Sequence, residues 1–158
     1  MSWVEADAFR ALFRAVPMAV GIVAVRRDGI VHATTVSSFC SLSLEPALLM
    51  LALHNDASIL GQVRQEGGFG LSVLAHDQRD LALRCAERGP GALDEDYWER
   101  GSAQPQLKGA VAWAGCQVEQ MLPGGDHQIV VARVVNSQVP GGAPLLHHDR
   151  AFHRLADL

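Results

Sequence analysis

Hydroxyl side chains are concentrated in one short stretch of the sequence, TTVSSFCSLSLEP, which runs from Thr34 to Pro46. Serine and threonine satisfy neighbouring backbone groups locally, so a cluster of them often marks an irregular segment whose backbone N–H groups face a ligand. The same composition is also typical of a simple turn. The residues alone therefore leave two interpretations of this stretch open, a ligand site and a turn.

Other motifs that carry chemistry are missing from the sequence. Gly67-Gly68-Phe69-Gly70 has the wrong spacing for a dinucleotide-binding GxGxxG motif and precedes a predicted strand. There is no GxSxG, GxxxxGK[ST] or HExxH motif. His147 and His148 are adjacent, so on a strand they point to opposite faces and form a poor chelate. We expect no metal site.

Composition limits the classes of partner. The chain has 158 residues, 49% of them hydrophobic, and a formal net charge of −4, which predicts one domain over residues 1–158 with no nucleic-acid or membrane partner. Three cysteines lie far apart with no CxxC pair, as is usual for reduced thiols in the cytoplasm. The N-terminal MSWVEADAFRALFRAV has the charge pattern of an amphipathic helix and not of a secretion signal.

Helical periodicity is clearest at the start of the chain. Phe9, Leu12, Phe13 and Val16 recur at helical spacing and predict one apolar stripe on an opening helix, which Pro17 helps to end.

A β-hairpin and a buried strand follow. MAVGIVAV and IVHATTV are joined by RRDG, in which Asp28-Gly29 favours a tight turn. The run ALLMLALH is continuously apolar and predicts a strand buried on both faces. A short helix is predicted over Ser58 to Gln65, and Gly67-Gly68 ends it.

The remaining elements are mostly strands. After the predicted strand FGLSVL, Asp77 is expected to cap a helix that Gly89-Pro90-Gly91 terminates. The segment from Gly89 to Gln104 predicts a long surface excursion with Tyr97 and Trp98 as its large anchors. AVAWAGCQVEQM and QIVVARVVNSQV predict two strands joined by a hairpin at Leu122 to Asp126, and PLLHH and AFHRL predict two more.

The fold class predicted from these elements is mainly β with peripheral α-helices. Hairpins prevail over regular βαβ alternation, so we expect an antiparallel barrel that closes on itself, with the helices outside.

The order of the motifs, from Phe9 to Leu155, resembles the flavin reductase-like proteins. The resemblance rests on six blocks in the same order: FRALFRAVPMAVGIVAV, TVSSFCSLSLEPALLML, FGLSVLAHDQRDLALRCA, LKGAVAWAGCQVEQ, GGDHQIVVARV and PLLHHDRAFHRL. It implies a Greek-key split β-barrel of the FMN-binding type. Proteins of this family are the small reductase components of two-component flavin monooxygenases.

The resemblance assigns the hydroxyl stretch to a flavin. The segment matching Thr34 to Cys40 is expected to wrap the isoalloxazine ring, with backbone groups at its polar edge and hydroxyls near the ribityl chain. A guanidinium suits phosphate, so Arg84 is a candidate for the flavin phosphate, although it could equally be a solvated surface arginine. The cofactor-binding residues predicted in this way are Thr34, Thr35, Val36, Ser37, Ser38, Cys40, Ala52, His54, Ser58 and Arg84.

The resemblance also places a nicotinamide nucleotide against the flavin. His127, in GGDHQI, matches a family histidine near the stacked rings and is the candidate catalytic residue, with a structural role in the hairpin as the alternative. The segment matching His147, His148 and Arg150 is expected to meet the nicotinamide nucleotide. Related proteins usually have an aromatic residue and a glycine in that segment, so this chain departs from the pattern there.

The resemblance therefore implies an NAD(P)H:flavin oxidoreductase that uses NADH or NADPH, reduces FMN or FAD, and supplies a partner monooxygenase. A flavin-binding protein for storage or sensing with little NADH turnover is the alternative, and a flavin-free interaction module is a third class. An apolar N-terminal stripe and exposed strand edges predict a homodimer.

Overall fold

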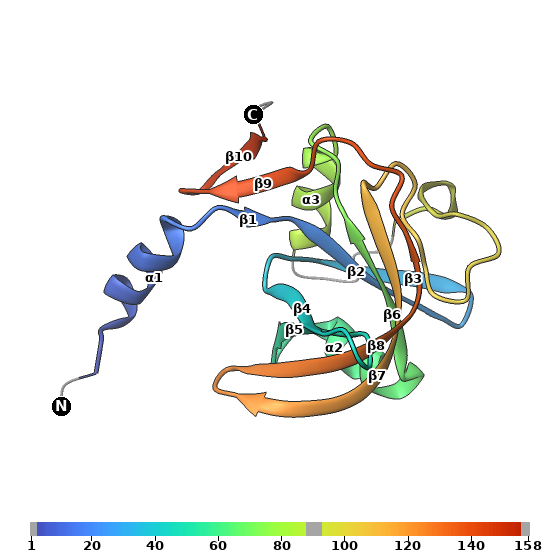
Figure 1. Cartoon of the computed structure of the whole chain (residues 1–158), viewed down its shortest axis with the longest axis horizontal. Helices are drawn as coiled ribbons and strands as arrows, with labels where there is room; N and C mark the ends of the chain where they lie inside the picture. Colours follow the sequence, from blue (N-terminus) through green and yellow to red (C-terminus); the bar gives the residue numbers. More distant parts are fainter. Residues whose placement is uncertain (1–2, 88–92, 156–158) are drawn as a thin grey trace.

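Two antiparallel sheets dominate the computed structural model, which describes residues 3–87 and 93–155 (Figure 1). The main sheet has the strand order β3-β2-β6-β7-β8-β5-β4, and the small one has the order β1-β9-β10. The strands are β1 (Met18–Ala19), β2 (Gly21–Arg27), β3 (Ile30–Val36), β4 (Phe39–Ser43), β5 (Leu48–His54), β6 (Gly68–Val73), β7 (Ala112–Gly124), β8 (His127–Gln138), β9 (Leu145–His148) and β10 (Ala151–Arg154). The helices are α1 (Ala6–Arg14), α2 (Ser58–Glu66), α3 (Arg79–Ala86) and the single 3₁₀ turn η1 (Glu95–Tyr97).

The predicted hairpin between β2 and β3 is confirmed. Arg27 pairs with Ile30, which leaves Asp28 and Gly29 as a two-residue turn. Both turn residues have positive φ, 51° and 78°. This is the conformation of a tight hairpin turn, and it explains why an Asp-Gly dipeptide stands here.

Strand β2 is buried on both faces and separates two hydrophobic cores. Val23 and Val25 pack in the core that includes Val63 of α2, which we call the α2 core. Ile22 and Ala24 pack in a second core with Ala82 and Cys85 of α3, which we call the α3 core. Because neighbouring side chains on a strand point to opposite faces, α2 and α3 cover opposite sides of β2.

The main sheet curls but does not close in the part of the chain that the structure describes, so the prediction of a closed barrel is wrong. β3 and β4 are the two edges of the sheet. The chain passes directly from β3 to β4 through Ser38, and Ser38 bonds to β5 instead of to β3. Its carbonyl accepts a hydrogen bond from Ala52 N–H (2.9 Å), and its hydroxyl donates to Ala52 O (2.8 Å). The mainly antiparallel β class with peripheral helices is confirmed, and the barrel is split.

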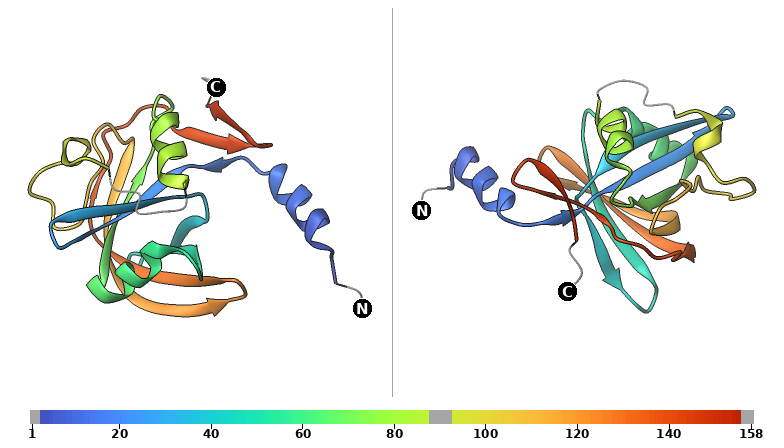
Figure 2. Two further views of the ribbon diagram at one scale, coloured as in Figure 1. Left: turned by 180° about the vertical axis from the view of Figure 1, so that it is seen from behind. Right: turned by 90° about the horizontal axis from the view of Figure 1, so that it is seen from above.

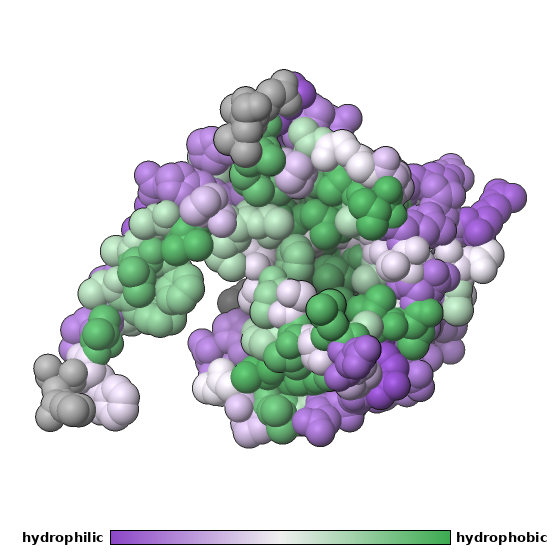
Figure 3. All heavy atoms as spheres, viewed as in Figure 1, coloured by the Kyte–Doolittle hydropathy of each residue, from purple (hydrophilic) through white to green (hydrophobic). Residues whose placement is uncertain are grey.

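Helix α1 extends from the body of the molecule, as two views show (Figures 1 and 2). None of its residues is buried. The predicted apolar stripe exists on α1, but the helix ends at Arg14, before Val16, and Phe9, Leu12 and Phe13 are all exposed. Figure 3 shows these apolar side chains along α1 and others over the centre of the same face of the molecule.

The predicted helix after β5 is confirmed as α2. It ends at Gly67, which has φ 66° and whose N–H donates to Val63 O (3.0 Å). The predicted cap of α3 is wrong. The helix begins at Arg79 with Gln78 as its cap residue, and the Gln78 side chain accepts from Ala75 N–H (2.9 Å) and donates to Lys108 O (2.8 Å). The predicted stop at residues 89–91 lies outside the described residues.

The described part of the predicted surface excursion is well anchored. Trp98 is only 1% exposed, as expected of an anchor, and Leu93 is buried as well. Gly70 allows a close approach here, since a Cβ on this residue would lie 1.8 Å from Pro105 O.

Strand β5 differs from its prediction on one face. Leu49, Leu51 and Leu53 are buried in the α2 core, whereas Leu48 and Met50 on the other face are only half-buried. One face of this apolar strand is therefore buried. On the other face, Leu48 lines a hollow that is described below.

Candidate functional site

A hollow of about 400 Å³ opens between the edge of the main sheet and the ends of two helices. β3 and the end of β5 border it on one side, the start of α2 on another, and the end of α3 on a third. We call it the α2 hollow. It is lined by Ala33, Thr34, His54, Asp56, Ala57, Ser58, Ile59, Ala86 and Glu87.

The edge strand β3 brings the hydroxyl stretch to this hollow. Thr34 lines it directly. Thr35 does not, because its hydroxyl donates a hydrogen bond to Ala82 O of α3 (2.7 Å); toward a ligand this oxygen can only accept. Val36 is buried in the α2 core, so only its backbone is available to a ligand. As β3 is an edge strand, half of its backbone N–H and C=O groups point away from β2.

The connection from β3 to β4 carries Ser37 and Ser38. The Ser38 hydroxyl is exposed and its hydrogen is used by Ala52 O, on the opposite strand β5. The structure thus joins Ser38 and Ala52, two residues that the sequence assigned to the same ligand. Ser37 is half-buried and forms no side-chain hydrogen bond among the described residues.

The N-terminus of α2 faces the hollow. Its cap residue is Ala57, which offers no side-chain hydrogen bond to the first N–H groups of the helix, and Ser58 is the first helical residue. Helix N-termini of this kind bind anions, because unpaired N–H groups and the helix dipole both favour negative charge. Asp56 stands immediately before the cap, with its side chain 91% exposed.

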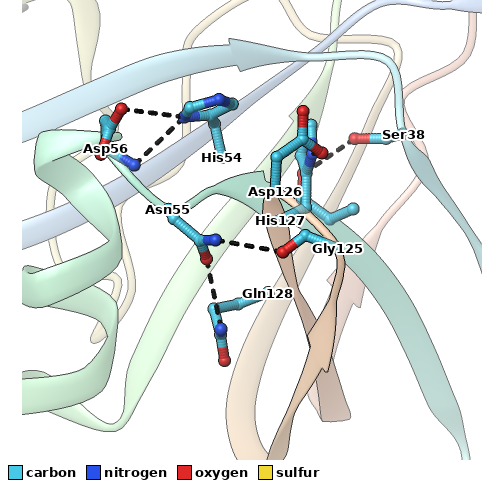
Figure 4. A network of polar contacts seen from close by, with 9 residues as sticks. Ser38, His54, Asn55, Asp56, Gly125, Asp126, His127 and Gln128 are labelled. Carbon is cyan, nitrogen blue, oxygen red and sulfur yellow. Dashed lines mark hydrogen bonds and ion pairs between the residues drawn. The ribbon is translucent and has the colours of Figure 1, made fainter.

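Two histidines lie side by side at the β5–β8 end of the hollow (Figure 4). His54 and His127 are directly opposite each other in the sheet, and their rings meet edge to face with centroids 5.2 Å apart. His127 Nδ1 lies 2.6 Å from Asp126 Oδ1. This contact holds the pKa of the Asp126 carboxyl below its usual value, first through the hydrogen bond and then through the charge of the histidine. Asp126 therefore stays ionised and orients the His127 ring.

Asn55 fixes this end of β5 to the β7–β8 turn. Its side chain donates to Gly125 O (3.3 Å) and accepts from Gln128 Nε2 (3.2 Å), and its N–H donates to Asp126 O (2.9 Å) (Figure 4). These bonds hold the hairpin that carries His127 against the strand that carries His54.

Arg84 lies on α3, but its guanidinium points to another segment. Its Nη2 is 3.9 Å from Asp94 Oδ2, and its Cζ lies 5.8 Å from the centre of the Tyr97 ring. Arg84 does not line the α2 hollow, whereas Ala86 and Glu87, further along the same chain segment, do.

Cys40 lies at a separate apolar hollow of about 320 Å³. We call it the β4 hollow. It is lined by Phe39, Cys40, Ser41, Ser43, Ala47, Leu48, Leu49, Leu71 and Val134.

The candidate nicotinamide residues of the C-terminal hairpin lie elsewhere. His147 and His148 line a third hollow of about 280 Å³, formed with Phe9 and Phe13 of α1. Arg150 is exposed in the β9–β10 turn with φ 66°, a left-handed conformation that glycine adopts more readily than other residues. Within one chain, the structure groups His127 with His54, Thr34 and Ser58, and it does not group these residues with the C-terminal hairpin.

Sequence reasoning missed the acidic residues of the α2 hollow. Asp56 and Glu87 both line it, and neither was a candidate. Asp56 could have been noticed, since it lies two residues before Ser58. Nothing in the sequence brings Glu87 to the same place, because that depends on where α3 ends against β3.

The comparison with known proteins decides the family. The sequence model described as the flavin reductase like domain matches residues 13–156. The chain belongs to this family. It is 33% identical to an NADH-dependent FMN reductase of Streptomyces nodosus subsp. asukaensis over 156 residues, which cover 94% of this chain and 84% of that relative.

Other members of the flavin reductase like family agree with this assignment. The chain is 32% identical to the reductase component of 4-hydroxyphenylacetate 3-monooxygenase of Thermus thermophilus, covering 94% of this chain and 96% of that one. The crystal structure of the flavin reductase component of a bacterial two-component tryptophan halogenase superposes with a TM-score of 0.88 at 32% identity, covering 98% of this chain and 100% of that one. The fold implied by the sequence resemblance is confirmed.

Among the residues that the structure describes, no helix is long and apolar enough to cross a membrane. Within the same residues, no three histidine, cysteine, aspartate or glutamate side chains gather as a metal site would require.

Proposed function

We propose that the protein is an NAD(P)H:flavin oxidoreductase, which transfers hydride from NADH or NADPH to FMN or FAD and supplies reduced flavin to a partner monooxygenase. The proposal rests on one observation about a chain that belongs to the flavin reductase like family. Thr34, His54 and Ser58 line the same hollow, and the ring of His127 contacts that of His54.

The groups around the α2 hollow fit a flavin by their chemistry. Thr34 and Ser58 offer hydroxyls suited to a ribityl chain. The free edge of β3 and the first turn of α2 offer backbone N–H groups suited to the polar edge of the ring and to an anionic tail. When bound, a flavin supplies the capacity to accept a hydride from a nicotinamide.

His127 is the residue we assign to positioning the nicotinamide. Its side chain is 38% exposed and thus accessible to a second substrate. The bond to Asp126 and the edge-to-face contact with His54 fix the direction of its ring. A ring held in this way reduces the entropy lost when the nicotinamide is aligned for transfer.

An assay of NADH oxidation with and without added free flavin tests the proposed function. A reductase that releases its product oxidises NADH at a rate that rises with added FMN or FAD and saturates. Tight flavin binding without NADH turnover would favour storage or sensing instead, and a protein that binds no flavin would refute both.

We also propose a homodimer, as predicted from the sequence. The exposed stripe of α1 supports it, because an isolated helix of nine residues gains little stability without a packing partner. The open apolar β4 hollow supports it as well. Light scattering with flavin present at micromolar concentration should give twice the mass of the 17.0 kDa chain, and a monomeric mass contradicts the proposal.

The partner is proposed to be a flavin-dependent monooxygenase, because relatives are named as reductase components of such systems. A cytoplasmic location is proposed because all three cysteines are free, as in a reducing compartment.

A further inference from the structure

The rings of His54 and His127 form a pair in which each ring has a different hydrogen-bond partner (Figure 4). The ring centroids are 5.2 Å apart and the ring planes meet at 78°. The His54 side chain is 45% exposed and that of His127 is 38% exposed. Two imidazoles this close repel each other when both are protonated, so the partners of each ring decide which one takes a proton.

The backbone of Asp56 holds the His54 ring in its neutral form. The N–H of Asp56 donates a hydrogen bond to His54 Nδ1 (3.1 Å). A ring nitrogen that accepts a hydrogen bond carries no proton, so the single ring proton of His54 is on Nε2. The Asp56 carboxylate offers a competing arrangement, because its Oδ2 lies 3.8 Å from the same Nδ1 and would pair with a protonated ring. The backbone bond prevails, because 3.8 Å exceeds hydrogen-bond distance and water screens a carboxylate that is 91% exposed.

The partner of His127 has the opposite effect on its ring. His127 Nδ1 lies 2.6 Å from Asp126 Oδ1, a contact that keeps the pKa of the Asp126 carboxyl below its usual value. An ionised carboxylate can only accept, so His127 Nδ1 carries a proton and Nε2 is the atom left to gain or lose one. Protonation therefore leaves the hydrogen bond of His127 intact, whereas protonation of His54 on Nδ1 would break its bond to the Asp56 N–H.

Three carboxylates among the described residues face this pair of rings. Asp126 comes from the β7–β8 turn, Asp56 from the connection of β5 to α2, and Glu87 from the segment after α3, where it lines the α2 hollow with His54. Asp56 and Glu87 attract a proton to His54 through space, but both are exposed, and the Asp56 N–H opposes that proton in direct contact. The contact with the N–H therefore decides the state of His54.

We propose that His54 is a positioning residue for His127: its neutral ring, held through Nδ1 by the backbone of Asp56, packs against the His127 ring and leaves His127 as the one ring of the pair that exchanges a proton. This inference rests on the proposed function, in which His127 positions the nicotinamide. A neutral neighbour fixes the direction of the His127 ring without placing a second positive charge beside it. His127 Nε2 is then available to the substrate as a donor or as an acceptor.

An NMR titration of the ring nitrogens in the full chain, without ligand, tests the assigned states. The signals of each ring are identified by their loss in His54→Phe and His127→Ala. At about pH 8 we expect the proton of His54 on Nε2 and that of His127 on Nδ1, and His127 should be the first of the two rings to protonate as the pH falls. Asp56→Asn should leave the His54 tautomer unchanged, because the backbone N–H remains. His54→Lys places a fixed positive charge beside His127 and should move the midpoint of the His127 titration to lower pH by about one unit. His76→Lys is the matched control and should leave it unmoved, because His76 is exposed and lies outside the α2 hollow.

Steady-state kinetics with saturating flavin test whether the His54 ring positions His127. His54→Asn keeps a side-chain acceptor for the Asp56 N–H but removes the ring, so it should raise KM for NADH and lower kcat/KM by about 10-fold. His54→Phe restores a neutral ring opposite His127 and should recover most of this loss, to within about 3-fold of the wild-type kcat/KM. Thermal melts of both variants show whether the comparison is made between equally folded proteins.

Three results overturn the inference while leaving the reductase function intact. One is protonation of His54 before His127, and another is a proton on Nδ1 of His54 at about pH 8. A third is an equal loss of kcat/KM in His54→Asn and His54→Phe, because the neutral ring then has no positioning effect. Failure of the proposed function is seen separately, since it requires that added flavin not stimulate NADH oxidation by the wild-type protein.

Discussion

Replacing His127 with alanine removes a side chain whose surroundings predict a kinetic effect without a large loss of stability. The His127 ring contacts the exposed carboxylate of Asp126 at 2.6 Å and the half-exposed ring of His54 at a centroid distance of 5.2 Å. Neither contact lies in a core. We therefore expect His127→Ala to lower the melting temperature by no more than about 2 °C.

The kinetic effect should be larger. If the fixed His127 ring aligns the nicotinamide, its loss should raise KM for NADH and lower kcat/KM by about 10- to 100-fold, or about 1.4 to 2.7 kcal/mol of transition-state stabilisation. Flavin affinity should stay within about 2-fold of the wild-type value, because the donors assigned to the flavin lie on β3 and α2.

Steady-state kinetics, a flavin titration and a thermal melt on one preparation separate the two roles of His127. His76→Ala serves as the matched control, since His76 is exposed and lies outside the α2 hollow. Asp126→Asn should reproduce part of the kinetic loss, because it frees the ring without removing it. Wild-type kcat/KM in His127→Ala, together with a clearly lowered melting temperature, would refute the positioning role and leave a structural one.

Three other substitutions or reactions test the packing described above. Gly70→Ala should lower the free energy of unfolding by about 3 kcal/mol, because the added Cβ would lie 1.8 Å from Pro105 O. Gly61→Ala should not destabilise, because no atom beyond its chain neighbours and the backbone of its own helix lies within 4 Å of the added Cβ. Equal unfolding midpoints for the two variants would contradict this prediction. Thr35→Val should cost about 1 kcal/mol of stability through the lost bond to Ala82 O and leave flavin binding unchanged, with Thr34→Val showing the reverse. A thiol reagent at about pH 8 should label the exposed Cys40 rapidly. Cys85 and Cys116 should react only after unfolding, because burial raises the pKa of Cys85 to about 11 and that of Cys116 to about 12. Rapid reaction of all three thiols would be evidence against the packed cores.

Local signals in the sequence predicted much of the fold. The Asp28-Gly29 turn and the glycine that ends α2 are determined by backbone conformations that few other residues adopt, so the sequence identifies them directly. The order of motifs predicted the family, and with it the hydroxyl stretch that reaches the α2 hollow at Thr34.

Features that depend on tertiary contacts could not be read in this way. Asp77 resembles a helix cap in sequence, yet the helix starts later because Gln78 is held between Ala75 and Lys108, a residue far along the chain. The spacing of Phe9, Leu12 and Phe13 predicts the apolar stripe of α1, but it does not predict that no residue of this helix is buried against the described part of the chain. Asp56 and Glu87 likewise come to line the same hollow only when α2 and α3 pack against the sheet.

The burial of β2 on both faces has a consequence for how the molecule opens. The side chains of β2 belong alternately to the α2 core and to the α3 core. Local unfolding of one core therefore does not release β2, because the other core still holds the strand. Its amide hydrogens, paired with β3 on one side and β6 on the other, should exchange with solvent deuterium only through global unfolding. Amides of α1 should exchange many orders of magnitude faster. The two helices that border the α2 hollow are thus attached to the slowest-exchanging part of the chain, which gives a flexible ligand a rigid frame to enter and leave.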